Sequence, residues 1–251
     1  MKILAPNLYK IILTNKNMRT SSRNLYIIKG SERSLMIDTS WNVPECLSEM
    51  EQALNELSID CRNLDIFVTH NHVDHSGYVS FFTDRGARAF MNPVEIAASS
   101  DRYHRFYEDN DMRRSYTSEV GVTKERTPDA WQEIKAGADQ LARDNNVNFD
   151  FPFTPIAPGD RLSYGGYDFE VVSLAGHTSG QCGLVELNAK LFFCADQVIL
   201  GLVPIVITSG KDQHLLTEYF ASLRELASDY SGYRFLPGHY GEFTEIKEET
   251  D

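Results

Sequence analysis

Residues 67–77, F-V-T-H-N-H-V-D-H-S-G, contain a dense group of residues of the types that bind metal ions. Three histidines and one aspartate fall within six residues there: His70, His72, Asp74 and His75. The apolar run at 65–68, just before them, predicts a buried strand that ends in a loop. Neutral imidazoles and ionised carboxylates are the ligands that borderline divalent metals prefer. Because four buried polar groups would each need a partner, a metal site explains the cluster better than packing does.

The spacing within this cluster predicts where the side chains face. His70, His72 and Asp74 have the same parity, so an extended backbone would direct all three to one side. His75 breaks the alternation and would face a second centre beside the first.

Three more ligand-type residues follow predicted strands later in the chain. His177 stands in A-G-H-T, Asp196 in C-A-D-Q and His239 in P-G-H-Y. Loops at one rim of a sheet can converge, so we expect these residues to join the cluster. The other two histidines, His104 and His214, fall in predicted helices, and we interpret them as surface or packing residues.

The predicted elements alternate as in an α/β protein. In the first half we expect strands at 8–13, 25–28, 34–38, 65–68 and 88–91, a helix at 44–58 and a short helix after Ser76. An extended connector follows at 151–158. In the second half we expect strands at 167–171, 183–187, 190–194 and 234–236, with a helix around 215–226.

A polar and largely helical segment at about 95–148 interrupts this pattern. It carries aromatic residues, and inserted segments often cover or line active sites. We therefore expect a helical insertion that contributes to a substrate pocket. The candidate pocket residues are Tyr103, Phe106, Tyr107 and, on the apolar loop 200–207, Leu202.

Composition limits the class of protein. The 251 residues, 42% of them apolar, suit a single domain spanning 1–251, and the net charge of −12 disfavours a nucleic-acid or anionic-membrane surface. The chain has four cysteines, no C-x-x-C pair and no recognisable secretory signal, so we expect a cytoplasmic protein with reduced thiols. The expected partner is a small-molecule substrate, with no nucleic acid and no membrane, and a homodimer is left open.

The ligand pattern resembles the metallo-β-lactamase-fold superfamily, in particular its glyoxalase II-like and lactonase-like hydrolases. The match rests on H-x-H-x-D-H at 70–75, followed by the three strand-end residues in the same order. Asn24 and Tyr26, which precede Asp38, are also similar to the family pattern. The resemblance implies a four-layer αββα sandwich with a helical insertion.

The resemblance also implies a ligand set for two divalent metal ions. His70, His72 and His177 would bind the first ion, Asp74, His75 and His239 the second, and Asp196 would bridge them. Zinc is the default for such ligands, although iron or manganese would accept the same set. Asp38 would orient the ligands, but Thr39-Ser40 follows it where the family more often has Thr-Gly.

The expected activity is metal-dependent hydrolysis. A metal-bridging hydroxide would attack a small ester, thioester or lactone, with Asp74 as the catalytic group that moves the proton. The 12 residues after His239 leave no room for the C-terminal helices with which glyoxalase II holds glutathione.

Four alternatives stay open at this point. A persulfide dioxygenase-type oxidoreductase would keep a single iron, so metal content separates it from a dinuclear hydrolase. A phosphodiesterase or nuclease is disfavoured by the acidic charge balance. A β-lactam hydrolase is disfavoured by Asp196, where such enzymes usually have a cysteine or a differently placed ligand. A non-catalytic binding module would have lost one or more of the ligand residues.

Overall fold

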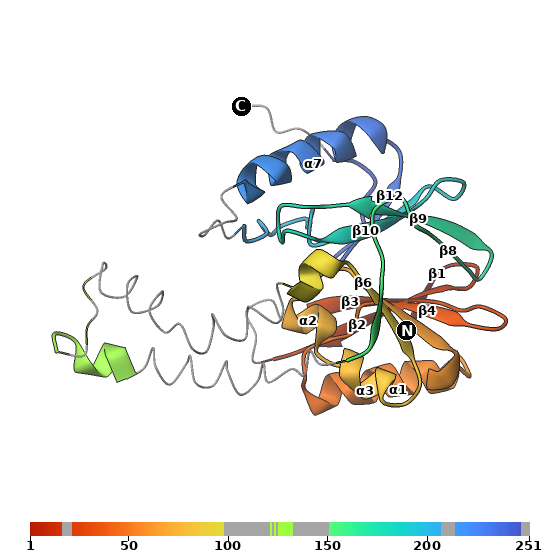
Figure 1. Cartoon of the computed structure of the whole chain (residues 1–251), viewed down its shortest axis with the longest axis horizontal. Coiled ribbons are helices and arrows are strands. Elements are labelled where there is room, and N and C mark those ends of the chain that lie inside the picture. The colour runs from red at the N-terminus through yellow and green to blue at the C-terminus, as the bar shows by residue number, and fades with distance from the viewer. Residues whose placement is uncertain are drawn as a thin grey trace.

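β5 (Leu64–Val68) is an interior strand of the first sheet, and all of its residues are buried. The computed structural model describes residues 1–16, 22–97, 121, 123, 125–132, 151–206 and 214–246. The layers of the fold are two sheets packed face to face, with helices on each outer side (Figure 1). This is the αββα sandwich expected from the sequence.

The first sheet has the strand order β1-β2-β3-β4-β5-β6-β7. Its first four strands pair antiparallel and its last four, from β4 onward, pair parallel. Besides β5 the strands are β1 (Lys2–Ala5), β2 (Leu8–Thr14), β3 (Ser22–Ile28), β4 (Ser34–Ile37), β6 (Arg88–Met91) and β7 (Phe153–Pro155).

The second sheet has the order β12-β11-β10-β9-β8. β10 is antiparallel to both β9 and β11, and β11 is parallel to β12, so β9, β11 and β12 run in the same direction. The strands are β8 (Arg161–Tyr164), β9 (Tyr167–Ser173), β10 (Cys182–Glu186), β11 (Leu191–Ala195) and β12 (Arg234–Pro237).

Helices cover the outer face of each sheet. α1 (Pro44–Glu56) and α3 (Val79–Thr83) cover the first sheet, and α7 (Leu215–Asp229) covers the second (Figure 1). α1 begins with Pro44, whose fixed φ and missing N–H suit the first turn of a helix. A short 3-10 turn lies at Cys61–Asn63, and α2 (Val73–Ser76) follows β5. No described helix is both long enough and apolar enough to cross a membrane.

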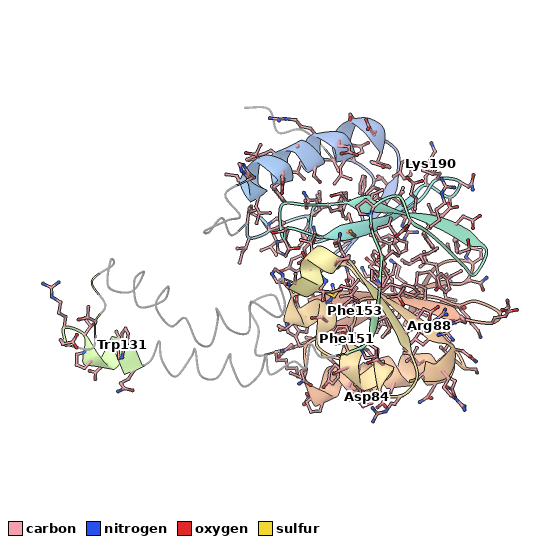
Figure 2. The ribbon with its side chains drawn as sticks, in the orientation of Figure 1. Asp84, Arg88, Trp131, Phe151, Phe153 and Lys190 are labelled. Carbon is pink, nitrogen blue, oxygen red and sulfur yellow. The ribbon has the colours of Figure 1, made fainter. Side chains whose placement is uncertain are left out.

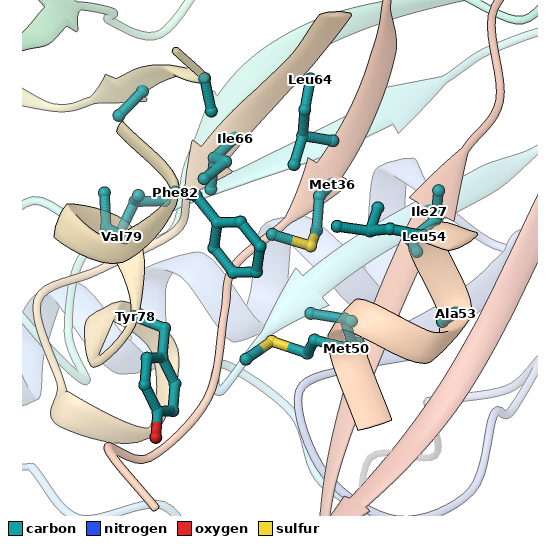
Figure 3. Close-up of a cluster of buried hydrophobic side chains, with 14 of the residues drawn as sticks. Ile27, Met36, Met50, Ala53, Leu54, Leu64, Ile66, Tyr78, Val79 and Phe82 are labelled. Atoms are coloured by element: carbon teal, nitrogen blue, oxygen red, sulfur yellow. The ribbon is translucent and has the colours of Figure 1, made fainter. Parts of the chain in front are cut away.

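The core beneath α1 shows why these helices form. Met50 and Leu54, one helical turn apart, are buried against Met36 of the sheet and against Phe82 of α3 (Figure 3). A residue spacing of four places such side chains on one helix face. Burial of each large apolar side chain contributes about 1.5–3 kcal/mol, so this face holds α1 on the sheet.

Aromatic side chains fill the space between the sheets and the space beneath α7. The rings of Tyr26 and Phe193 meet edge-on across the sandwich, with centroids 5.2 Å apart. Under α7, the Phe235 ring stacks on Phe192 at 5.5 Å and on Phe243 at 5.0 Å. The first group of side chains therefore fixes the two sheets against each other, and the second group fixes α7 on the second sheet.

Most of the predicted strands are confirmed, with boundaries that differ by at most three residues. The connector expected at 151–158 contains an edge strand, β7. Phe153, its first residue, and Phe151 just before it pack on the helix side of the first sheet (Figure 2). β1 is an additional strand that the sequence pattern did not predict. The expected insertion at 95–148 lies mostly outside the described residues.

One buried carboxylate joins the sheets at the edge where β5 begins. Asp65 is fully buried, and it accepts hydrogen bonds from the guanidinium groups of Arg33 and Arg88 and from the Tyr164 hydroxyl of the second sheet. Burial alone would raise the pKa of Asp65, but Arg88, Arg33 and Tyr164 together lower it to about 2. The folded pKa is depressed, so the stabilisation is present at neutral pH and is lost as the pH falls through this value.

We predict that Asp65→Asn lowers the free energy of unfolding of the metal-free protein by about 2 kcal/mol at pH 7. The difference from the wild type should shrink between about pH 4 and pH 2, because the wild-type carboxyl is then protonated. Urea unfolding across this pH range measures both. Asp168→Asn, at an exposed carboxylate on β9, is the control. It should lower the free energy of unfolding by less than Asp65→Asn does at neutral pH. A pH-independent difference for Asp65→Asn would contradict the assignment.

Candidate metal centre

The ligand-type residues collect at one rim of the sandwich. β5 leads directly to His70, and β9, β11 and β12 lead to His177, Asp196 and His239. These strands of the second sheet run in the same direction, so their carboxyl ends meet at one edge. α2, which carries Asp74, lies beside the first sheet at that edge (Figure 1). All seven predicted residues are thereby brought together.

Three histidines form the first cluster, and their ring nitrogens point at one another. His72 Nδ1 lies 2.9 Å from His70 Nε2 and 2.9 Å from His177 Nε2. The ring planes meet nearly at right angles, with centroids 4.5–5.0 Å apart. His70 and His177 are buried and His72 is half-buried. Three converging imidazole nitrogens can serve a metal ion.

The second cluster mixes carboxylates and imidazoles. His239 Nε2 lies 3.2 Å from Asp74 Oδ2 and 3.4 Å from Asp196 Oδ2. His75 Nε2 lies 3.4 Å from Asp196 Oδ2 and 3.7 Å from Asp74 Oδ2. The four ligand-type atoms all lie within 4.8 Å of one another, so they too could hold one ion.

Asp196 lies between the two clusters. Its Oδ2 is 3.4 Å from His75 Nε2 in the second cluster and 3.8 Å from His177 Nε2 in the first. A carboxylate in this place can serve both clusters at once, which is the arrangement that the resemblance implies.

Asp74 does not face the same side as His70 and His72, so the prediction from their shared parity was wrong for this residue. Backbone beyond His72 is not extended, because His72 is the N-cap of α2 and Asp74 lies in the first turn of that helix. The turn directs Asp74 to the same cluster as His75, away from His70. The partition implied by the family resemblance agrees with this grouping, whereas the strand spacing did not predict it.

Hydrogen bonds to the far ring nitrogens orient four of the five histidines. The Nδ1 atoms of His177 and His239 lie 2.7 Å from the Ile205 carbonyl oxygen and 2.6 Å from that of Ser22. His70 Nδ1 lies 3.0 Å from Thr69 Oγ1. These contacts leave Nε2 of each ring facing its cluster, and a neutral ring that donates through Nδ1 binds metal through Nε2.

Asp38 orients His75 in the same way. Its Oδ2 accepts from His75 Nδ1 at 2.9 Å, from the Thr69 hydroxyl at 2.9 Å and from Arg23 Nη2 at 2.5 Å. Asp38 has φ of 63°, and its Oδ1 also accepts from the Thr69 backbone N–H. In the turn after Asp38, the hydroxyl of Thr39 donates to the carbonyl of His75, which holds this turn on the ligand loop.

β3 holds the turn that carries His239. Arg23 Nη1 donates to the Gly238 carbonyl, and Asn24 Nδ2 and the Tyr26 hydroxyl both donate to the Pro237 carbonyl. This explains why Asn24 and Tyr26 belong to the pattern. Sequence reasoning did not identify Arg23 or Thr69, and only the proximity of Arg23 to Asn24 could have drawn attention to it.

The two clusters differ in their electrostatics. Burial, reinforced by the other histidines, holds the pKa of His70 well below its usual value, and burial also lowers the pKa of His177. Burial alone would lower the pKa of His239 as well, but the Asp196 and Asp74 carboxylates raise it to about 10. Burial therefore favours the neutral form of His70 and His177, whereas the carboxylates of the second cluster favour a proton on His239.

The donors fit divalent metal ions. His75 Nε2 and Asp196 Oδ1 are buried and have no hydrogen-bond partner among the residues that the structure describes. A buried carboxylate costs free energy unless it is compensated, and a cation between the two carboxylates would provide that compensation. Five imidazoles and two carboxylates suit zinc, and iron or manganese as well.

The predicted pocket residues are mostly untested. Tyr103, Phe106 and Tyr107 lie outside the described residues. Leu202 is half-buried and pairs with Ile199 in an isolated β-bridge.

The other two histidines do not contribute to the described clusters. His104 lies outside the described residues, and His214 is exposed at the start of α7.

Comparison with known proteins gives one family. A family model for the metallo-beta-lactamase superfamily matches residues 18–239. Among curated relatives, a bovine protein named acyl-coenzyme A thioesterase MBLAC2 is 25% identical over 229 residues, covering 88% of this chain and 74% of the relative. The human protein of that name is 24% identical with the same coverage.

Solved structures agree on the fold. A metallo-beta-lactamase family protein from Thermus thermophilus has a TM-score of 0.73 at 21% identity, covering 97% of this chain and 76% of that one. A beta-lactamase domain protein from Burkholderia ambifaria has a TM-score of 0.74 at 17% identity, covering 97% and 72%.

Gly238 provides a sharp test of the second cluster. A Cβ at this position would lie 2.3 Å from Asp196 Oδ1 and 3.0 Å from His75 Cε1, so an alanine must displace the cluster. We predict that Gly238→Ala weakens zinc binding at least ten-fold, as measured by competition with a chromophoric chelator. Gly241→Ala, three residues later, meets nothing within 4 Å and should bind zinc as the wild type does. Equal affinities for all three proteins would argue against a metal site here.

Proposed function

We propose that this chain, which belongs to the metallo-beta-lactamase superfamily, is a dinuclear metal-dependent hydrolase that cleaves an acyl thioester. The convergence of seven ligand-type side chains into two adjacent clusters carries the proposal. The choice of a thioester among the ester, thioester and lactone candidates is supported by the curated thioesterase relatives at about 25% identity.

Each cluster has a defined part in this proposal. His70, His72 and His177 would hold one ion and Asp74, His75 and His239 the other, with Asp196 serving both. When bound, such ions polarise an acyl carbonyl and lower the pKa of water toward 7, which supplies a nucleophile at neutral pH. The protein contributes the placement of these groups, since their orienting hydrogen bonds are already formed.

Asp74 is the residue we assign to proton transfer. Burial alone would raise the pKa of Asp74, but His75 and His239 hold it below its ordinary value, so the carboxylate is ionised at neutral pH. Its side chain is 16% exposed, whereas that of Asp196 is 9% exposed. Asp74 therefore combines an ionised carboxylate with more solvent access than Asp196 has. It would take a proton as the acyl carbon is attacked and return it to the leaving thiolate sulfur.

An apolar surface next to the first cluster suits the acyl group. The Ile205 carbonyl binds His177, so the 203–205 segment lies against the centre. Its side chains Val203 and Ile205 are 85% and 69% exposed. Exposed apolar side chains beside a catalytic rim would bind a hydrocarbon chain by removing it from water.

The proposed reaction is tested with a panel of acyl-coenzyme A thioesters, lactones and esters, with release of free thiol followed for the thioesters. We predict thioester hydrolysis without oxygen consumption, and a loss of at least 100-fold in kcat for Asp74→Asn. Asp84→Asn, at an exposed position on the helix side (Figure 2), is the matched control and should retain full activity. Metal content is measured for each variant. An unchanged rate for Asp74→Asn would remove this assignment, and oxygen consumption with one iron would support a persulfide dioxygenase-type activity.

The acyl surface is tested by chain length. We predict that Ile205→Ser raises KM about ten-fold for a long-chain thioester and little for an acetyl thioester, because only a long chain reaches the side chain. Ile3→Ser removes an equally exposed isoleucine from β1 and should change neither value. A uniform change across chain lengths would contradict the placement of the acyl group.

A further inference from the structure

Glu95 is a fully buried carboxylate that the mechanism above does not use. It follows β6 by a few residues and lies where the predicted insertion begins. Its Oε2 accepts from the Asn71 backbone N–H at 2.9 Å, and its Oε1 accepts from the Gly180 backbone N–H at 2.7 Å. One side chain therefore binds two loops that belong to different sheets.

Both loops carry ligands of the first cluster. Asn71 stands between His70 and His72, and Gly180 stands three residues after His177. A second hydrogen bond joins the same two residues, since Asn71 Nδ2 donates to the Glu95 backbone carbonyl at 3.0 Å. Glu95 thus makes three of its contacts with the segments that position the three converging nitrogens.

The loop around Gly180 is shaped to admit Glu95. A Cβ on Gly180 would lie 2.8 Å from Val94 Cβ and 3.2 Å from Glu95 Cγ, so no larger residue fits without displacing this segment. Nearby, the Cys182 backbone N–H donates to the Thr69 carbonyl at 3.0 Å and joins the same two parts of the chain. The contact between the two sheets, here called the seam, is therefore closely packed where these two loops meet.

We propose that Glu95 is a positioning residue for the first metal centre. Its carboxylate fixes the loops of His72 and His177 against each other before an ion binds, so that binding does not have to order them. The proposal rests on the proposed metal role of the clusters. It does not depend on which substrate is hydrolysed.

The chemistry of the contact explains why the residue is a glutamate. Two backbone N–H groups need two acceptor oxygens, and an ionised carboxylate offers both. Gln would place an NH₂ group against one of these donors. Asp keeps the charge but is one methylene shorter and cannot span both loops.

Zinc titration of single-centre backgrounds tests the proposal without any activity measurement. His239→Ala impairs the second cluster, and His72→Ala impairs the first. We expect Glu95→Gln to weaken zinc binding ten-fold or more in the His239→Ala background and to leave it within two-fold in the His72→Ala background. Glu95→Asp should behave like Glu95→Gln, because geometry and not charge is lost.

Glu186→Gln is the matched control. Glu186 is also buried and also accepts a backbone N–H, from Ala189, but it lies at the β10–β11 turn that Lys190 marks in Figure 2. Glu186→Gln should leave the zinc affinity unchanged in both the His239→Ala and the His72→Ala background. If Glu95→Gln does not fold, Asn71→Ala, which removes one of the three bonds, should weaken the same centre to a smaller degree.

Equal effects of Glu95→Gln on both backgrounds, or equal effects of Glu95→Gln and Glu186→Gln, would show a purely structural role and overturn the proposal. Wild-type affinity in Glu95→Asp would also overturn it. Failure of thioester hydrolysis with these zinc affinities as expected would instead count against the proposed substrate.

Discussion

Two carboxylates held close together inside the protein are the constraint on which the site depends. The side chains of Asp74 and Asp196 are 16% and 9% exposed, and both oxygens face His239 Nε2, at 3.2 and 3.4 Å. Burying two like charges is costly unless positive charge lies between them. In the metal-free protein, protons on His75 and His239 supply this positive charge, which is why the pKa values of both histidines are raised. A divalent ion would compensate the two carboxylates with a larger positive charge and would displace those protons.

The fold supplies this arrangement from strands that end at one rim. Because the ligands come from both sheets, the seam between the sheets must be fixed to within a fraction of an ångström. Two buried side chains do this, each for one of the clusters. Arg23 joins Asp38 to the turn of His239, and Glu95 joins the loops of His72 and His177. The protein thus holds both clusters by its own hydrogen bonds, and metal binding would add to an arrangement already formed.

Much of this could be predicted from the sequence because its signals are local. Alternating and apolar runs predicted the strands, and ligand-type residues directly after them predicted the cluster. Asp74 was assigned to the wrong face because α2 has only four residues, too few to show a helical period. Arg23 and Glu95 carried no local signal, since their partners lie up to 215 and 85 positions away in the chain. The roles of Arg23 and Glu95 could be recognised only from the tertiary structure.

The central claim is that the two clusters hold two divalent ions. The most direct test is elemental analysis of protein purified without chelator, combined with zinc titration of the stripped protein. We predict two equivalents of metal per chain, zinc foremost, and recovery of two equivalents on titration. A single equivalent that does not rise with added zinc, iron or manganese would contradict the account, as would a protein that binds none.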